Sequence, residues 1–261
     1  MVERLYFFGD PGTGKTKAAL SIAAALTDHT FYYIEADRPV EKIIAAFGGL
    51  PNVTVLKAFR HEDIQKSIDK VTALIQTSDE PEKTWVIMDT VSKVYEDVQD
   101  TVSLKVHGKT ADELAEHRLK NPEKGLVAGN TTGEWSIISR VYMNDIIYPI
   151  TTFYGNNFVL ISHQKPYNVV RGDKVFHPTM PNERLVSTRL QELGWVPSAY
   201  YKTQTKVDTF LHFNNVNDVW TIYTIKDTER NYLNKPTPFS DFWRDYNLLT
   251  SMSHNGVVHV A

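Results

Sequence analysis

Short runs of apolar residues recur along the first two thirds of the chain and alternate with segments of helical spacing. The apolar runs have the lengths typical of strands and lie at residues 4–8, 31–36, 53–56, 85–89 and 157–162. Near-continuous apolar runs are typical of strands that are buried on both faces. Their alternation with helical segments predicts an α/β fold, in which helices cover both faces of a mostly parallel sheet.

Helical patterns fill the intervals between these runs. The first lies at residues 17–26 and is rich in alanine and leucine, which favour helices. Others are predicted near residues 40–47 and over residues 135–150. The clearest spans residues 61–76, where apolar side chains recur at helical spacing, at Ile64, Ile68, Val71 and Ile75.

The pattern changes in the last third of the chain. Three apolar stretches, at residues 199–207, 209–213 and 219–225, have no helix between them, and Asn214–Asp218 supplies a turn between the last two. We expect these strands to form an antiparallel extension of the same sheet, followed by a helix around residues 239–249. The whole pattern predicts one domain over residues 1–250 and a C-terminal tail at residues 251–261.

One long segment has no strand pattern. Residues 101–134 contain a helical piece near residues 111–119 and then a stretch rich in glycine and asparagine. Loops of this length are usually functional or disordered. We therefore interpret this segment as an insertion loop.

Composition excludes several classes of protein. The chain has 261 residues, of which 42% are hydrophobic and 23% charged, as in a soluble globular protein. Its net charge is −3, so any contact with nucleic acid must come from a local patch. It has no cysteine, which excludes disulfides and thiolate zinc sites. No apolar run is long enough to span a membrane, and the first strand begins too early for a signal peptide, so we expect a cytoplasmic protein.

A phosphate-binding loop follows the first predicted strand. Residues 9–16 read GDPGTGKT and fit the Walker A motif G-x-x-x-x-G-K-T, between a strand and a helix as its mechanism requires. Glycines let backbone N–H groups surround a phosphate, and the following helix points its positive end at the same anion. We expect Lys15 to reach the β- and γ-phosphates and Thr16 to bind Mg²⁺. The predicted nucleotide-binding residues are Gly9, Asp10, Pro11, Gly12, Thr13, Gly14, Lys15, Thr16 and Lys17.

Carboxylates at the ends of two predicted strands complete the candidate catalytic site. Asp89 ends an apolar strand, the position that holds the Mg²⁺ shell in P-loop proteins. The next residue is Thr90 and not glutamate, so the base must come from elsewhere. Glu35 and Asp37 end the second strand, where a carboxylate can deprotonate the attacking water. Of the two we favour Asp37 as the base, with Glu35 as the alternative.

A polar pair ends the strand at residues 157–162. A side chain in this place can contact the γ-phosphate and report its presence to a neighbouring loop. Gln164 is the first candidate for this role, and His163 is the second.

Three of these features together resemble the RecA/KaiC-type branch of P-loop ATPases. They are Asp89 followed by Thr90, the acid on the second strand, and the pair His163-Gln164. Within that branch the chain looks most like the small RecA-like ATPases of phages, some of which act in single-strand annealing. The resemblance implies a RecA-like core, hydrolysis of ATP with Mg²⁺, a homo-oligomer in the form of a ring or filament, and DNA-facing loops at residues 101–134 and 165–185.

The resemblance also implies a basic finger that reaches the ATP of the next subunit. Lys226 and Arg230 occupy the matching place after a late strand. Two departures from the family pattern are that the second strand ends in Glu-Ala-Asp and that the chain lacks the N-terminal element with which RecA polymerises.

Charge distinguishes the two candidate DNA loops. Residues 101–134 hold a balanced mixture of acidic and basic side chains, whereas residues 165–185 interleave cations with aromatic rings, which suits a single strand. The candidate DNA-binding residues are Lys165, Tyr167, Arg171, Lys174 and Phe176.

Other functions share the same Walker A loop. A nucleotide-dependent switch or an assembly or packaging ATPase, without direct DNA binding, is the main alternative. A P-loop kinase would need an arginine-rich lid and an acceptor pocket, and the strands at residues 199–225 argue against it. The fold alone does not decide between these functions.

Overall fold

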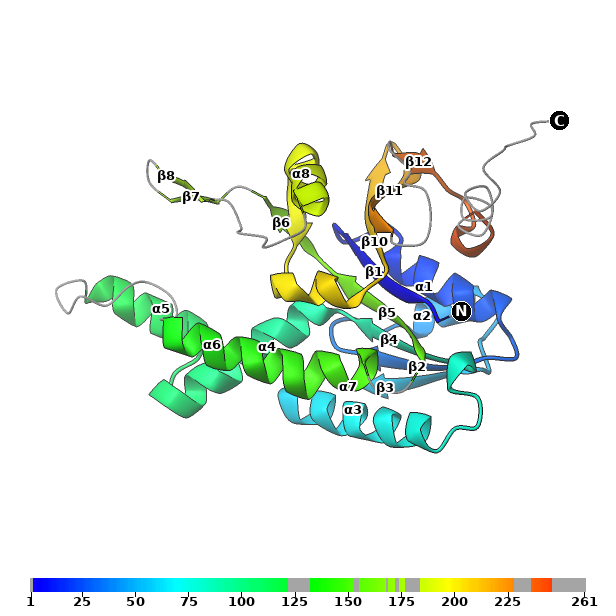
Figure 1. Cartoon of the computed structure of the whole chain (residues 1–261), viewed down its shortest axis with the longest axis horizontal. Coiled ribbons are helices and arrows are strands. Elements are labelled where there is room, and N and C mark those ends of the chain that lie inside the picture. The colour runs from blue at the N-terminus through cyan, green and yellow to red at the C-terminus, as the bar shows by residue number, and fades with distance from the viewer. Residues whose placement is uncertain are drawn as a thin grey trace.

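An eight-stranded sheet forms the centre of the computed structural model, which describes residues 2–121, 132–152, 155–167, 169–171, 174–176, 184–227 and 236–245 (Figure 1). The strand order is β12-β11-β10-β1-β5-β4-β2-β3. The six strands from β10 to β3 are parallel, and antiparallel pairing begins only with β11. The strands span Arg4–Gly9 (β1), Thr30–Glu35 (β2), Val53–Lys57 (β3), Thr84–Asp89 (β4), Asn157–Ser162 (β5), Thr209–Val216 (β10), Val219–Asp227 (β11) and Thr237–Pro238 (β12). The predicted α/β fold with an antiparallel C-terminal extension is confirmed.

Helices cover both faces of this sheet. They span Lys15–Ala25 (α1), Glu41–Ala46 (α2), His61–Gln76 (α3), Val91–His107 (α4), Ala111–Lys120 (α5), Thr132–Val141 (α6), Tyr148–Thr151 (α7) and Arg184–Leu193 (α8), with a short 3₁₀ turn at Pro81–Lys83 (η1). In the described ranges, no helix has the length and apolar character needed to cross a bilayer.

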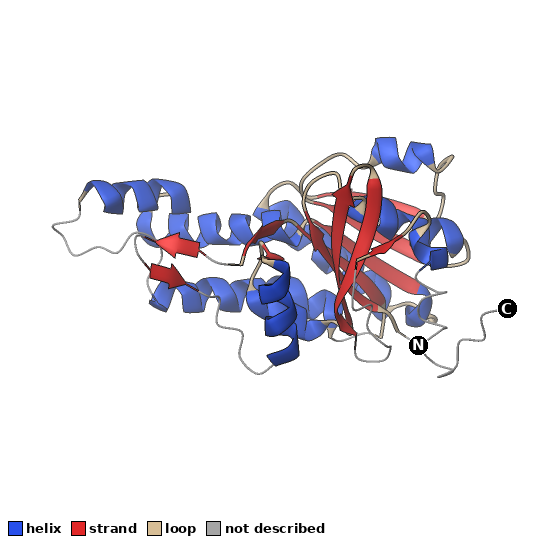
Figure 2. Cartoon of the chain, turned by 90° about the horizontal axis from the view of Figure 1, so that it is seen from above, coloured by secondary structure: helices blue, strands red, loops and turns tan. Residues whose placement is uncertain are grey.

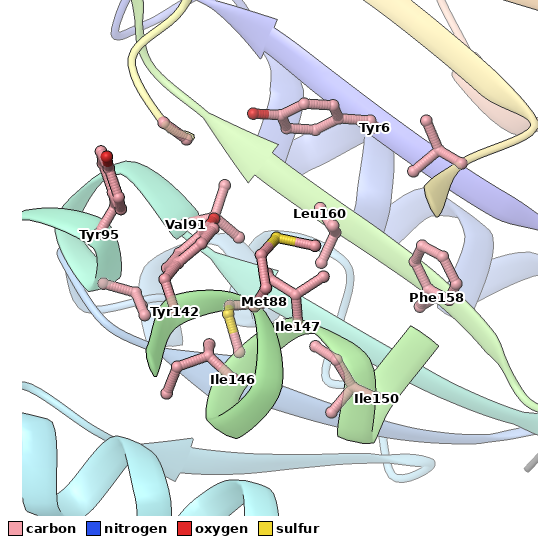
Figure 3. Packing of buried hydrophobic residues seen from close by; sticks show 14 of the residues in the cluster. Tyr6, Met88, Val91, Tyr95, Tyr142, Ile146, Ile147, Ile150, Phe158 and Leu160 are labelled. Atoms are coloured by element: carbon pink, nitrogen blue, oxygen red, sulfur yellow. The ribbon is translucent and has the colours of Figure 1, made fainter. Parts of the chain in front are cut away.

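Strand β1 shows how the sequence divides the core into two layers. Successive side chains of a strand point to opposite faces. Tyr6 and Phe8 therefore belong to the apolar cluster under α3, α4 and α6, whereas Leu5 and Phe7 belong to the cluster under α1. Figure 3 shows Tyr6 on the first of these layers, together with Tyr142 from the opposing helix.

The helix predicted over residues 135–150 is interrupted by a π-helical segment. The segment Tyr142–Ile147 (η3) joins α6 to α7, and it buries Tyr142, Met143, Ile146 and Ile147 against the sheet (Figure 3). Segments of this kind are rare and often lie at functional sites. Periodicity alone did not predict it, because the apolar spacing changes little across it.

The insertion loop predicted at residues 101–134 is largely helical where it is described. Helix α4 continues to His107, and Gly108 ends it in a left-handed conformation with φ 67°. Thr110 and Glu113 then form a capping box that starts α5. Together α4, α5 and α6 form an arm, which extends beyond the carboxyl edge of the parallel strands (Figures 1 and 2).

A buried ion cluster fastens this arm. Glu134 on α6 accepts a hydrogen bond from Arg118 Nη2 on α5, over 3.0 Å, and also contacts His107 Nε2 on α4. Arg118 and Glu134 are both buried, with 5% and 7% of their surfaces exposed. The cluster therefore joins all three helices of the arm.

The prediction of a strand at residues 199–207 is wrong. Residues Tyr201–Lys206 form a 3₁₀ helix (η4) that buries Thr203 and Gln204. The sheet offers no place for another strand there, because β1 is already paired with β5 on one side and with β10 on the other.

Two short antiparallel pairs follow β5. Strand β6 (Gln164–Pro166) pairs with β9 (Trp195–Pro197), and β7 (Val169–Arg171) pairs with β8 (Lys174–Phe176). The β7–β8 hairpin projects from the same end of the sheet as the arm (Figures 1 and 2). The predicted DNA-facing loop at residues 165–185 thus contains regular structure in its described parts.

Candidate nucleotide-binding site

The Walker A loop connects β1 to α1 and depends on glycine at two positions. A Cβ atom placed on Gly9 would lie 2.2 Å from the Phe213 carbonyl oxygen, so only glycine lets β10 approach the loop. Gly14 caps α1 with φ 88°, a left-handed conformation that glycine adopts without strain. The loop therefore turns tightly and leaves the first N–H groups of α1 directed at an anion.

Lys15 lies in the hollow of this loop. Its Nζ donates hydrogen bonds to the carbonyl oxygens of Gly9 (2.9 Å) and Asp10 (2.7 Å) and to Thr13 Oγ1 (3.3 Å). Burial lowers the pKa of Lys15 to about 8, and the nearby carboxylates of Asp89 and Asp10 oppose this decrease. A buried ammonium group held by carbonyl oxygens is well placed to exchange them for phosphate oxygens.

Thr16 and Asp89 meet beside the loop, as the sequence predicts. Thr16 Oγ1 donates a hydrogen bond of 2.6 Å to Asp89 Oδ2. The Tyr33 hydroxyl donates another of 2.6 Å to the same oxygen and holds the carboxylate from the side of β2. Burial raises the pKa of Tyr33 well above its ordinary value, so this hydroxyl stays a donor at any physiological pH.

The two oxygen groups fit a magnesium ion. A hydroxyl and a carboxylate are hard ligands, and Mg²⁺ in nucleotide sites usually takes one or two protein ligands together with phosphates and waters. The described residues hold no cluster of three or more His, Cys, Asp or Glu side chains that could hold a metal ion. Thr16 and Asp89 are thus the residues that would hold Mg²⁺.

Asp37 lies across the pocket from the loop and is held by a histidine. His163 Nε2 lies 3.2 Å from Asp37 Oδ2, and the Arg38 guanidinium lies 3.9 Å from the same oxygen. Asp37 and His163 both line the cavity that contains the Walker A loop. The structure thus brings the favoured acid and the second sensor candidate together, from two different strands.

Glu35 does not share this environment. Its side chain is fully buried, and Oε2 accepts a hydrogen bond of 2.7 Å from the Val40 backbone N–H. Its other oxygen, Oε1, has no hydrogen-bond partner among the described residues. Burial raises the pKa of Glu35 above its ordinary value. Glu35 does not line the cavity, because the chain turns directly after β2 and sends the two carboxylates in different directions.

Gln164 forms a hydrogen bond with a side chain of β10. His212 Nε2 donates a hydrogen bond of 2.8 Å to Gln164 Oε1, since an amide oxygen can only accept. Burial and the charge of Lys15 lower the pKa of His212 to about 4, so the ring is neutral at pH 7. His163 lines the nucleotide cavity and Gln164 does not.

Aromatic residues close the far end of the cavity, which has a volume of about 540 Å³. Phe47, at the end of α2, and Trp220, on β11, both line it. The ammonium group of Lys17 lies over the Trp220 ring, 4.7 Å from its centre, and Phe239 stacks beyond it. Sequence reasoning missed both Phe47 and Trp220, because no motif links two rings that lie so far apart in the chain.

The candidate DNA-binding and finger residues lie elsewhere. Lys165 is exposed on β6, but Tyr167 is buried with 4% exposure, so its ring is not available to stack on a base. Arg171, Lys174 and Phe176 are described only as members of the β7–β8 hairpin. Lys226 lies half-buried on β11, opposite Phe210, and Arg230 lies outside the described residues.

Comparisons with known proteins identify the fold and the family of the chain. The crystal structure of the RadB recombinase superimposes with a TM-score of 0.51 at 10% sequence identity, over 92% of this chain and 88% of that chain, which shows a shared RecA-type fold. A search of curated proteins finds no similar sequence. Residues 5–143, just over half of the chain, match the family described as ATPase family associated with various cellular activities (AAA). This chain therefore belongs to the AAA family of P-loop ATPases.

Proposed function

We propose that the protein hydrolyses ATP with Mg²⁺, as a homo-oligomer that acts on single-stranded DNA in recombination, annealing or replication. The observation that carries the hydrolytic part is the convergence of Lys15, Thr16, Asp89 and Asp37 on one cavity of about 540 Å³. Pockets for small ligands usually measure about 300–1,000 Å³, so a nucleoside triphosphate fits this volume.

In the proposed reaction each residue has a separate task. The Walker A backbone and the Lys15 ammonium group bind the β- and γ-phosphates and stabilise the charge that develops on them. Thr16 and Asp89 would hold Mg²⁺, which when bound would neutralise more of that charge. Asp37 accepts the proton of the attacking water, and the contact with His163 fixes the orientation of its carboxylate.

The nucleotide base of ATP is proposed to bind at the aromatic end of the cavity. Phe47 and Trp220 offer ring faces for stacking. The Trp220 Nε1–H is buried and has no acceptor among the described residues, so it can donate to a ring nitrogen or carbonyl of the base. Lys17 lies over Trp220 and also lines the cavity, so a base that stacks on Trp220 would displace its ammonium group.

The DNA-related and oligomeric parts of the proposal have other support. The RadB structure is that of a recombinase, and its fold is shared. Residues Lys226 and Arg230 match the place of the basic finger in the RecA/KaiC-type branch, and a finger of that kind requires a neighbouring subunit. The relation to the small phage ATPases belongs to this proposal as well and rests on the strand-end motifs.

A Lys15→Ala variant tests the central claim. We expect hydrolysis of ATP to fall at least about 100-fold, because the variant loses a charged group on the transferred phosphate. The matched control is Lys66→Ala, which removes an exposed cation on α3, far from the loop. Phosphate release at saturating ATP measures both variants, and wild-type turnover by Lys15→Ala would refute the assignment.

A further inference from the structure

A second cleft, with a volume of about 680 Å³, opens between α6–η3, β9 and η4. It shares no lining residue with the nucleotide cavity. Its inner wall is aromatic, with Tyr95, Tyr200 and Tyr201 in one network of rings, and Trp135 stands at its edge with 40% of its surface exposed.

The rings present both packed and open faces. Tyr200 lies 6.0 Å from Tyr95 and 4.8 Å from Tyr201, measured between ring centres. Tyr95 is nearly buried, whereas Tyr200, Tyr201 and Tyr148 are half-buried. The Tyr95 ring is therefore held in place by its packing. The rings of Tyr148, Tyr200 and Tyr201 keep part of their surface exposed to the cleft.

Cations surround this aromatic wall. Arg140, Lys165 and Lys202 line the cleft and are exposed, and Lys206 lies over the ring of Tyr148 at 4.4 Å from its centre. Among the described lining residues there is no carboxylate. In a chain whose net charge is −3, a cleft with three cations and no acid has the charge that an anion requires.

This combination matches the chemistry of a single-stranded polynucleotide. Stacking on aromatic rings accepts any base, and cations at the rim contact the phosphates. A purely apolar ligand would not use the cations. A free nucleotide would need a concentrated set of donors for its terminal phosphates, and the glycine-rich loop that supplies them lies in the other cavity.

We propose that this tyrosine-lined cleft binds a segment of single-stranded nucleic acid, with bases against Trp135, Tyr200 and Tyr201 and phosphates against Arg140, Lys165 and Lys202. The inference rests on the proposed action on DNA and assigns it to a surface that the sequence did not single out. The proposed DNA contact therefore lies at α6 and η4 and not at the β7–β8 hairpin. Lys165 belongs to both the predicted DNA-binding residues and the cleft.

The position of Lys165 also connects the cleft to the nucleotide cavity. His163 lines the nucleotide cavity, Gln164 contacts His212 beside the Walker A loop, and Lys165 lines the cleft. Residues 163 and 165 of one short segment thus line the two different sites. His163 in turn contacts Asp37.

Fluorescence anisotropy with a fluorescein-labelled oligothymidylate of 20 nucleotides, in the presence of ATP and Mg²⁺, tests the proposal. We expect the double variant Arg140→Ala/Lys202→Ala to bind at least about tenfold more weakly and with a smaller salt dependence. Trp135→Ala should also lose about tenfold, through loss of stacking. The matched control, Lys66→Ala/Lys70→Ala, removes two exposed cations from α3 and should bind as the wild type does.

Several outcomes would overturn the proposal. They are wild-type affinity in the Arg140/Lys202 variant, no binding by the wild type at low salt, equal competition by a duplex of the same length, and equal competition by polyglutamate. The last would indicate an acidic protein partner instead. Binding of a fluorescent ATP analogue to the same variants keeps the two proposals separate, because it should stay unchanged if only the cleft is affected.

Discussion

At the scale of single residues, the two carboxylates at the end of β2 have different environments. Asp37 lines the nucleotide cavity beside His163, whereas Glu35 is buried and accepts a hydrogen bond from the Val40 N–H. The sequence places them two positions apart and favours Asp37, but it does not show that their environments differ. The difference arises because the chain leaves the extended conformation between them.

Conservative substitutions distinguish the two carboxylates. We expect Asp37→Asn to lower the rate of ATP hydrolysis about 100-fold or more, because an amide cannot accept the proton of water. Glu35→Gln should retain hydrolysis, because its amide oxygen can still accept the Val40 hydrogen bond. Single-turnover phosphate release measures both, and the opposite ranking would make Glu35 the base.

The same Glu35→Gln variant has a consequence for stability. The raised pKa of Glu35 means that the folded state favours the protonated carboxyl, so the wild type loses stability as pH rises through that pKa. We expect the variant to have a higher unfolding midpoint than the wild type at pH 8 and a smaller advantage near pH 4. Thermal unfolding at both pH values provides the check.

Lys15 makes nucleotide affinity depend on pH. Its pKa of about 8 in the free protein means that a growing fraction is neutral above that pH, whereas a bound triphosphate favours the charged form. We therefore expect the dissociation constant for ATP to be constant from pH 6.5 to 7.5 and to rise toward tenfold per pH unit above about 8. Titration with a fluorescent ATP analogue measures this, and a flat profile up to pH 10 would contradict the role of Lys15.

At the scale of elements, the predictions that succeeded rest on short-range patterns. Apolar runs identified β1 to β5, and helical spacing identified α3 from His61 to Gln76 at its exact limits. The prediction of a strand at residues 199–207 failed because a run of tyrosine and threonine suits a strand locally, while both edges of β1 are occupied by β5 and β10. Whether a segment pairs into a sheet depends on which other strands have a free edge, and the sequence of that segment alone does not show this.

The arm depends on one buried carboxylate. Glu134→Gln removes the negative charge that faces the buried Arg118 guanidinium, and breaking a buried ion pair costs about 3 kcal/mol. We expect faster hydrogen exchange in α5 and a lower unfolding midpoint. Glu116→Gln, in an exposed pair with Lys120 on the same helix, is the control and should change neither. Equal behaviour of the two variants would show that the cluster does not fasten the arm.

At the scale of the whole molecule, the nucleotide site draws on segments from both ends of the chain. The Walker A loop could be predicted in full, because its motif carries its own geometry. Trp220 and Phe47 could not, since β11 and α2 meet only after the sheet has formed. The second cleft could not be predicted either, because its rings come from separate elements, Tyr95 from α4, Trp135 from α6 and Tyr201 from η4.

A mixing experiment tests the proposed assembly. We expect Arg230→Ala to bind ATP and hydrolyse it slowly, and Asp37→Ala to be inactive. If the finger acts on the next subunit, a random equal mixture contains about a quarter of sites with both groups intact and recovers activity in that proportion. A mixture with no more activity than its separate components would exclude a finger in trans.

The place of β1 in the sheet constrains how the protein can be made. Leu5 pairs with Val159 on one side and with Thr209 on the other, so the first strand of the chain lies between two of the later ones. During synthesis on the ribosome, both edges of β1 therefore stay unpaired until more than half of the chain, up to β5, has been made. A fragment that ends at residue 143, where the family match ends, would expose both edges and should aggregate instead of binding nucleotide.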